Sequence, residues 1–205
     1  RWPPEIRDRD PGALQAIASR LARDVAGIKF MQFLFYAQWR RLKTYCNERN
    51  IHLFGDIPIY VPLDSADVWA HPDLFKLDEA KQPVAVSGVP PDYFSDTGQL
   101  WGHPVYEWGV HRQRRYDWWL QRIAHNLGLF DYIRIDHFRG LVACWEVPAD
   151  EKTAVNGKWS PVPAEDFFDA LLQRFPCVTV IAENLGYIID DVREIIHRYR
   201  LLGMK

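Results

Sequence analysis

The sequence predicts an α/β fold that forms part of a (β/α)8 TIM barrel. Buried strand patterns alternate along the chain with amphipathic helical patterns, which is typical of a parallel sheet covered by helices. Three of the strand patterns end in an acidic residue: Asp56, Asp136 and Glu183. Because the carboxyl ends of parallel strands meet on one face, and that face holds the active site in such barrels, these acids predict a shared site.

The first half of the chain begins with helical spacing over residues 11–50, which Gly27 divides into two helices. Residues 51–61 form the first strand pattern, and Ser65 can cap a short helix after it. Some forty residues rich in Pro and Gly follow with little regular spacing. A loop of that length is usually functional or disordered, and its aromatic content argues against disorder.

The second half repeats the alternation of strands and helices. The predicted elements are a helix over 116–127 that Gly128 ends, a strand over 132–136, a turn-rich excursion over 145–163 with a hairpin at Asn156-Gly157, a helix over 165–175, a strand over 177–183 and a helix over 190–200. We find no internal repeat and no domain boundary, so residues 1–205 are predicted to belong to a single barrel domain. They would supply its central strands, about the third to the fifth, with a long aromatic loop inserted.

Composition excludes several classes of function. A net charge of -2 over 205 residues gives no electrostatic case for nucleic acid or an anionic membrane surface. No apolar run is long enough to span a bilayer. Three widely separated cysteines are typical of reduced thiols in a cytoplasmic protein. The sequence contains no cofactor-binding motif, so no cofactor is expected. The chain starts at Arg1 without a Met, so we expect a piece of a longer protein.

The nonamer YIRIDHFRG (132–140) carries the most informative chemistry. In a strand, Arg134 and Asp136 share one face while the isoleucines share the other. The cation would keep Asp136 ionised, whereas Glu183, which follows an apolar run, could hold a proton. One such acid alone could equally cap a helix or pair with an arginine. Together, an ionised and a protonated carboxyl group suit glycoside chemistry.

Other hydrolytic chemistries fit the sequence less well. There is no G-x-S-x-G elbow for a serine nucleophile, and no cysteine lies beside a suitable histidine. The seven histidines have no H-x-x-x-H spacing, so no metal is expected, and His137 is predicted to be a hydrogen-bonding neighbour of Asp136.

Several motifs, in order, resemble the 4-α-glucanotransferases called amylomaltase or disproportionating enzyme, glycoside hydrolase family 77. They are FLFYAQWRRLKTYCNERNI (33–51), GDIPIYVPLDSADVWAHPDLF (55–75), GVPPDYFSDTGQLWGHPVYEW (88–108), YIRIDHFRG (132–140), WEVPADEKTAVNGKW (145–159) and AENLG (182–186). A single RIDHF motif would be weak support, but motifs covering most of the chain in the family's order are strong support.

The resemblance implies a role for each candidate residue. Asp136 would be the nucleophile and Glu183 the general acid and base of a retaining double displacement. Arg134, Asp56 and His137 would support the nucleophile. The aromatic loop would be a glucan-binding lid in which Asp92, Tyr93, Phe94 and Trp101 contact α-1,4-glucans and maltooligosaccharides.

The sequence departs from the family pattern in three places. His103 stands where Asn is commoner, and Asn184 where Asp is commoner. The third carboxylate of the family, an Asp preceded by His, has no counterpart, because the chain contains no His-Asp dipeptide. We therefore expect the chain alone to be inactive and to self-associate through open barrel edges. Two alternatives stay open: an α-glucan hydrolase of the same clan, and a non-catalytic glucan-binding fragment.

Overall fold

The computed structural model describes residues 2–185 and 188–204, and the chain divides into two compact units, Arg1–His52 and Leu53–Lys205. The first unit is helical, with α1 (Pro4–Arg7), α2 (Pro11–Arg20) and α3 (Ala22–Asn47). The break between the long helices lies at Leu21 and not at Gly27, which lies inside α3. A glycine inside a helix costs only about 1 kcal/mol, so it does not by itself end one. The single barrel domain stays a prediction.

The second unit contains a parallel sheet in the strand order β1-β4-β7-β8. Its strands are short: β1 (Phe54–Ile57), β4 (Tyr132–Ile135), β7 (Val180–Ala182) and β8 (Leu202–Gly203). The three predicted strands are confirmed with narrower bounds, and β8 is an additional strand that the sequence did not indicate. The sheet is parallel throughout, as the strand and helix alternation predicted.

The alternation of side chains along β1 and β4 separates a core face from a polar face. Ile57, Ile133 and Ile135 are almost completely buried. The helices that cover them are α6 (Asp117–Leu129) and α7 (Ala164–Arg174), and these contribute a second set of fully buried side chains: Trp119, Ile123, Phe167, Phe168 and Leu171. Each such burial stabilises the fold by roughly 1.5–3 kcal/mol, so this face fixes the register of the strands. Asp56 and Arg134 therefore point to the opposite face.

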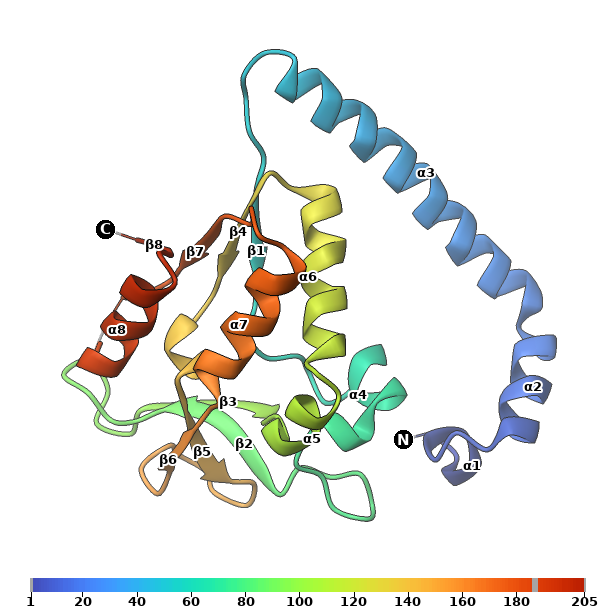
Figure 1. Ribbon diagram of the computed structural model, residues 1–205. Helices are drawn as coiled ribbons and strands as arrows, with labels where there is room; N and C mark the ends of the chain where they lie inside the picture. Colours follow the sequence, from blue (N-terminus) through green and yellow to red (C-terminus); the bar gives the residue numbers. More distant parts are fainter. Residues whose placement is uncertain (1, 186–187, 205) are drawn as a thin grey trace. The chain divides into compact units, whose positions relative to one another are not determined.

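A second, antiparallel sheet has the order β3-β2-β5-β6 and lies on the side where the parallel strands end (Figure 1). It consists of β2 (Ala85–Val89), β3 (Gln99–Pro104), β5 (Ala143–Pro148) and β6 (Lys158–Pro161). The long irregular stretch expected from the sequence thus contains two strands, which is a correction. β5 and β6 do pair as a hairpin, with Trp145 opposite Trp159, but residues 149–157 connect them, so the tight turn expected at Asn156-Gly157 is a further correction: this dipeptide only ends the loop before β6.

The remaining elements lie in the connections between strands. They are α4 (Ala66–Ala70), α5 (Trp108–Gln113), α8 (Asp190–Arg198) and two short 3-10 helices, Pro72–Leu74 and Phe138–Leu141. Helix α8 joins two strands of the parallel sheet, β7 and β8. Ser65 caps α4 as predicted, because its side chain accepts a hydrogen bond from the Val68 N–H. Helix α6 continues one residue beyond Gly128. Among the described helices, none has the length and apolar character that crossing a bilayer would need.

Candidate active site

The cation and the two aspartates meet on the polar face of the parallel sheet. Asp56 lies opposite Arg134 in the register of β1 and β4. One terminal nitrogen of Arg134 is 2.7 Å from Asp56 Oδ1, and the other is 2.6 Å from Asp136 Oδ1. The ion pair predicted between Arg134 and Asp136 is therefore present, and Asp56 completes it as a second anion from the neighbouring strand.

The guanidinium group of Arg134 is much less exposed than the carboxylates it binds. Its side chain is 19% exposed, against 55% for Asp56 and 46% for Asp136. Burial alone would lower the pKa of Arg134, but the hydrogen bonds and charges of the two aspartates outweigh burial and raise that pKa above its ordinary value. Arg134 is thus a permanent positive charge that holds one face of Asp136.

The main chain places Asp136 and Glu183 by extending the parallel hydrogen-bond ladder past the strands. The Asp136 N–H donates to the Ile57 carbonyl over 3.0 Å, and the Glu183 N–H donates to the Ile135 carbonyl over 3.1 Å. Both acids therefore stand one residue beyond the end of their strands, on adjacent strands of one sheet. This is the convergence that the sequence predicted for them.

Both carboxylate oxygens of Glu183 accept main-chain hydrogen bonds. The His137 N–H lies 3.1 Å from Oε2, and the Leu185 N–H lies 2.7 Å from Oε1. The first of these bonds crosses from the loop after β4, so the residue next to Asp136 directly orients Glu183. The positions of Asp136 and Glu183 are thus linked through the main chain of His137.

His137 occupies an unusual backbone conformation between the two acids. Its φ of 51° and ψ of 50° lie in the left-handed region, which histidine visits more readily than most residues. Its ring packs edge-on against Trp101, with 4.6 Å between centroids. Burial lowers the pKa of His137 to about 4, against the opposing charge of Asp136, so the ring is neutral at pH 7.

A cavity of about 600 Å³ opens beside Glu183 and His137. It brings together five of the predicted site residues, which are Asp92, Tyr93, Trp101, His137 and Glu183. Phe94, Asp56, Arg134 and Asp136 are not among the lining residues. The loop and Glu183, the acid that follows β7, thus share one cavity, while the Arg134 group lies beside it.

The aromatic loop presents two large side chains to solvent. Tyr93 is 96% exposed and Phe94 is 92% exposed, and their rings meet edge to face with centroids 5.5 Å apart. Asp92 shapes the loop, because its Oδ1 accepts hydrogen bonds from the Phe94 and Ser95 N–H groups, both over 2.9 Å. An exposed aromatic pair on an ordered turn is typical of a surface that binds a ligand with apolar faces.

Two further residues of the cavity escaped the sequence analysis. The guanidinium carbon of Arg139 lies 3.8 Å from the ring centroid of Trp159, and both side chains line the cavity. Arg139 belongs to the YIRIDHFRG nonamer, and Trp159 follows the predicted hairpin turn. Both residues belong to motifs that the sequence analysis had already singled out. A cation in one of these motifs and an aromatic residue in the other could have indicated this pair.

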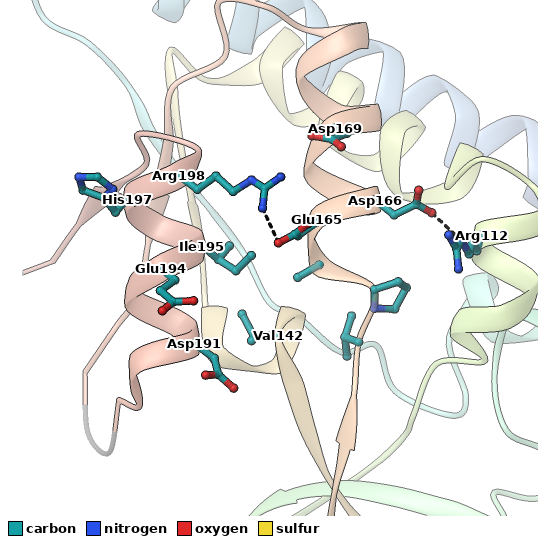
Figure 2. Close-up of a pocket in the computed structure, with 13 residues that line it drawn as sticks. Arg112, Val142, Glu165, Asp166, Asp169, Asp191, Glu194, Ile195, His197 and Arg198 are labelled. Atoms are coloured by element: carbon teal, nitrogen blue, oxygen red, sulfur yellow. Dashed lines mark hydrogen bonds and ion pairs between the residues drawn. The ribbon is translucent and has the colours of Figure 1, made fainter.

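A second concave region of about 730 Å³ lies between α7 and α8 (Figure 2), and none of the predicted site residues lines it. Its walls are acidic, but Arg198 pairs with Glu165 over 2.5 Å and Arg112 with Asp166 over 2.8 Å. These ion pairs join α7 to α5 and α8 and partner two of the lining acids. Within residues 2–185 and 188–204, no three His, Cys, Asp or Glu side chains gather so as to hold a metal.

The arrangement at the strand ends can support displacement at a carbon bearing an oxygen leaving group. One carboxylate is held by a permanent cation, and a second is oriented by main-chain N–H groups beside a cavity with aromatic walls. Aromatic faces bind the apolar faces of sugar rings, and paired carboxyl groups serve as nucleophile and proton donor.

Comparison with known proteins gives a consistent result. The family model described as 4-alpha-glucanotransferase matches residues 1–205. The chain is 47% identical over 204 residues to the 4-alpha-glucanotransferase of Aquifex aeolicus (strain VF5), covering 100% of the chain and 42% of the relative. It is also 47% identical to that of Thermus thermophilus, covering 100% of the chain and 41% of the relative. The chain spans about two fifths of the length of these relatives.

Solved structures resemble the chain as well. The amylomaltase from Streptococcus agalactiae in complex with acarbose has a TM-score of 0.95 and 42% identity, covering 98% of the chain and 41% of that structure. The amylomaltase from Corynebacterium glutamicum has a TM-score of 0.74 at 20% identity, covering 85% of the chain and 24% of that structure. The second likeness concerns the fold alone.

Proposed function

The chain belongs to the 4-alpha-glucanotransferase family, and from this premise we propose that it is the central part of an enzyme that transfers α-1,4-glucan segments between maltooligosaccharides. The observation that carries the proposal is the arrangement of Asp56, Arg134 and Asp136 next to the oriented carboxyl group of Glu183. That arrangement stands on consecutive parallel strands, where barrel enzymes of this kind place their chemistry.

The proposed reaction is a retaining double displacement. Asp136 attacks the anomeric carbon while Glu183 gives a proton to the departing glycosidic oxygen, which leaves with its glucan. Glu183 then takes a proton from the hydroxyl group of an acceptor glucan. That hydroxyl attacks the same carbon and releases Asp136, so two inversions retain the configuration.

The arginine has a defined task in this scheme. Arg134 holds one oxygen of Asp136 at 2.6 Å, which leaves the second oxygen of the carboxylate available for attack. Because the guanidinium group is also bound by Asp56 from β1, its position is set by two strands. Arg134 and Asp56 are thus proposed to orient the nucleophile.

The exposed aromatic loop suits transfer to a sugar better than transfer to water. Tyr93 and Phe94 offer faces to an acceptor glucan, and Trp101 and Asp92 lie beside them. A lid of this kind would shield the glycosyl intermediate until the acceptor arrives. We therefore favour transfer over the hydrolysis that the alternative reading would give.

The chain by itself is proposed to be inactive and to act only within a full-length TIM barrel protein. The four parallel strands found in the described part of the chain cannot close a barrel of eight, and the sequence holds no counterpart of the family's third carboxylate. The open edges of β1 and β8 would favour self-association of the isolated chain. A cytoplasmic location is part of the same proposal, in keeping with the three free cysteines.

The test uses maltotriose and the full-length protein that carries this chain. We expect glucose together with longer maltooligosaccharides from the unmodified protein, and none from Asp136→Ala or Glu183→Gln. Asp150→Ala, an exposed aspartate on the loop after β5, is the matched control and keeps the activity. Turnover by Asp136→Ala at the unmodified rate would refute the assignment, and glucose with maltose alone would indicate a hydrolase. Glucose release by the isolated chain would contradict its proposed inactivity.

A further inference from the structure

A methionine completes the set of partners around Arg134. The Nε–H of Arg134 donates to Met204 Sδ over 3.2 Å, while its two terminal nitrogens bind Asp56 and Asp136. Met204 directly follows β8, the strand at the far end of the parallel sheet from β1. The guanidinium group is therefore held by one side chain from β1 and by two side chains that directly follow β4 and β8.

The main chain of Met204 is fixed to the residue beside Glu183. Its N–H donates to Asn184 Oδ1 over 2.9 Å. The approach is close, since a Cβ added to Gly203 would lie 2.9 Å from Asn184 Nδ2. Met204 thus contacts the cation of the proposed nucleophile through its side chain and the neighbour of the proposed acid through its main chain.

Sulfur is a suitable acceptor at this position for an electrostatic reason. A thioether is neutral and accepts only weakly, whereas a third carboxylate would share the positive charge that now serves Asp56 and Asp136. The guanidinium fork is planar and rigid, so a partner on Nε sets the tilt of the plane without competing for its charge.

We propose that Met204 is a positioning residue, which sets the orientation of Arg134 and through it the attacking oxygen of Asp136. This inference rests on the proposed function, because it assigns Met204 a task in that reaction. The contrasting explanation is that Met204 only fills space beside β7.

Two substitutions separate positioning from packing. Met204→Leu keeps an apolar side chain of similar size but removes the acceptor, and such exchanges usually cost little stability. Met204→Gln restores an acceptor for the Arg134 Nε–H. The control is Met31→Leu, because Met31 is the only other methionine of the chain and lies exposed on α3.

The experiment measures kcat and KM for maltotriose in the full-length proteins, together with their thermal midpoints. We expect Met204→Leu to lower kcat by about tenfold with KM changed by less than about twofold, and Met204→Gln to recover much of the loss. The Met31→Leu control keeps both constants. An unchanged kcat in Met204→Leu would overturn the inference. A loss of kcat that parallels a lower thermal midpoint, and that becomes larger in Met204→Gln, would overturn it as well.

A readout that needs no turnover accompanies the kinetics. With ¹⁵N-labelled arginine, the Nε–H of Arg134 is expected to exchange with solvent several-fold faster in Met204→Leu than in the unmodified protein. Equal exchange would count against the contact itself. If the unmodified protein transfers no glucose, the proposed function fails, while the exchange rates still decide whether Met204 holds Arg134.

Discussion

Replacing His137 by asparagine tests how the site responds to acid. The buried ring has a pKa of about 4, whereas the same ring in the unfolded chain has its ordinary value of 6.5. Between pH 6.5 and about pH 4, the His137 ring is therefore protonated in the unfolded chain but neutral in the folded chain. Stability contributed by the neutral ring is present above pH 6.5 and is lost as the pH falls toward 4.

The size of the effect follows from the separation of the two pKa values. Between pH 6.5 and pH 4 this separation corresponds to a loss of roughly 3 kcal/mol in the free energy of unfolding, which is a large part of the stability of an ordinary domain. Asparagine is the substitution of choice, because it tolerates the left-handed backbone that His137 adopts and cannot titrate. His111, whose pKa burial also lowers to about 4, contributes equally to both proteins and cancels in the comparison.

The assay is urea unfolding of the chain at pH 7 and pH 4.5, followed by tryptophan fluorescence. Between these two pH values, His137→Asn should lose about 2 kcal/mol less free energy of unfolding than the unmodified chain. His197→Asn, an exposed histidine of α8, is the control and should lose as much as the unmodified chain. An identical loss in His137→Asn and the unmodified chain would refute the reasoning.

Two further predictions concern the support of the second sheet. Lys76→Met leaves the almost buried Glu146, now 2.6 Å from the Lys76 ammonium, without its cation, and should cost roughly 1–3 kcal/mol by urea unfolding. Adding Glu146→Leu should recover most of this cost, and no recovery would mean that packing dominates. Gly157→Ala places a Cβ 2.2 Å from Trp145 Nε1, so it should destabilise the chain by about 1–3 kcal/mol and alter the near-UV circular dichroism. Gly27→Ala, with open space around it, should instead be neutral or slightly stabilising.

The parallel strands could be predicted because their signal is local. In β4 two isoleucines stand at alternate positions, in β7 Val180 and Ile181 are adjacent, and in both strands an acid directly follows the last strand residue. Both the existence of these strands and the face of Arg134 follow from that short pattern. The strand ends then predict which acids converge, and the ladder bonds of Asp136 and Glu183 agree with it.

The second sheet could not be predicted because its pairing is distant in sequence. Ala85 of β2 pairs with Pro148 of β5, and no periodicity within residues 85–104 reveals that partner. The contact of Arg139 with Trp159 depends on the same sheet, because Trp159 lies on β6, so the contact was missed together with the sheet. Similarly, β8 has only two residues, too few for any pattern, although Met204 after it reaches Arg134.

The distance in sequence between Asp56 and Arg134 also affects folding during synthesis. These residues lie 78 positions apart, so a ribosome must add the intervening chain before β1 can meet its partner β4. At roughly 5–20 residues per second, that interval is of the order of 4 to 16 seconds. During this interval β1 has no partner strand, but it is only four residues long and includes a glycine and an aspartate. Such a short, charged segment is a poor template for wrong partners, so the residues that prepare the site also protect the nascent chain.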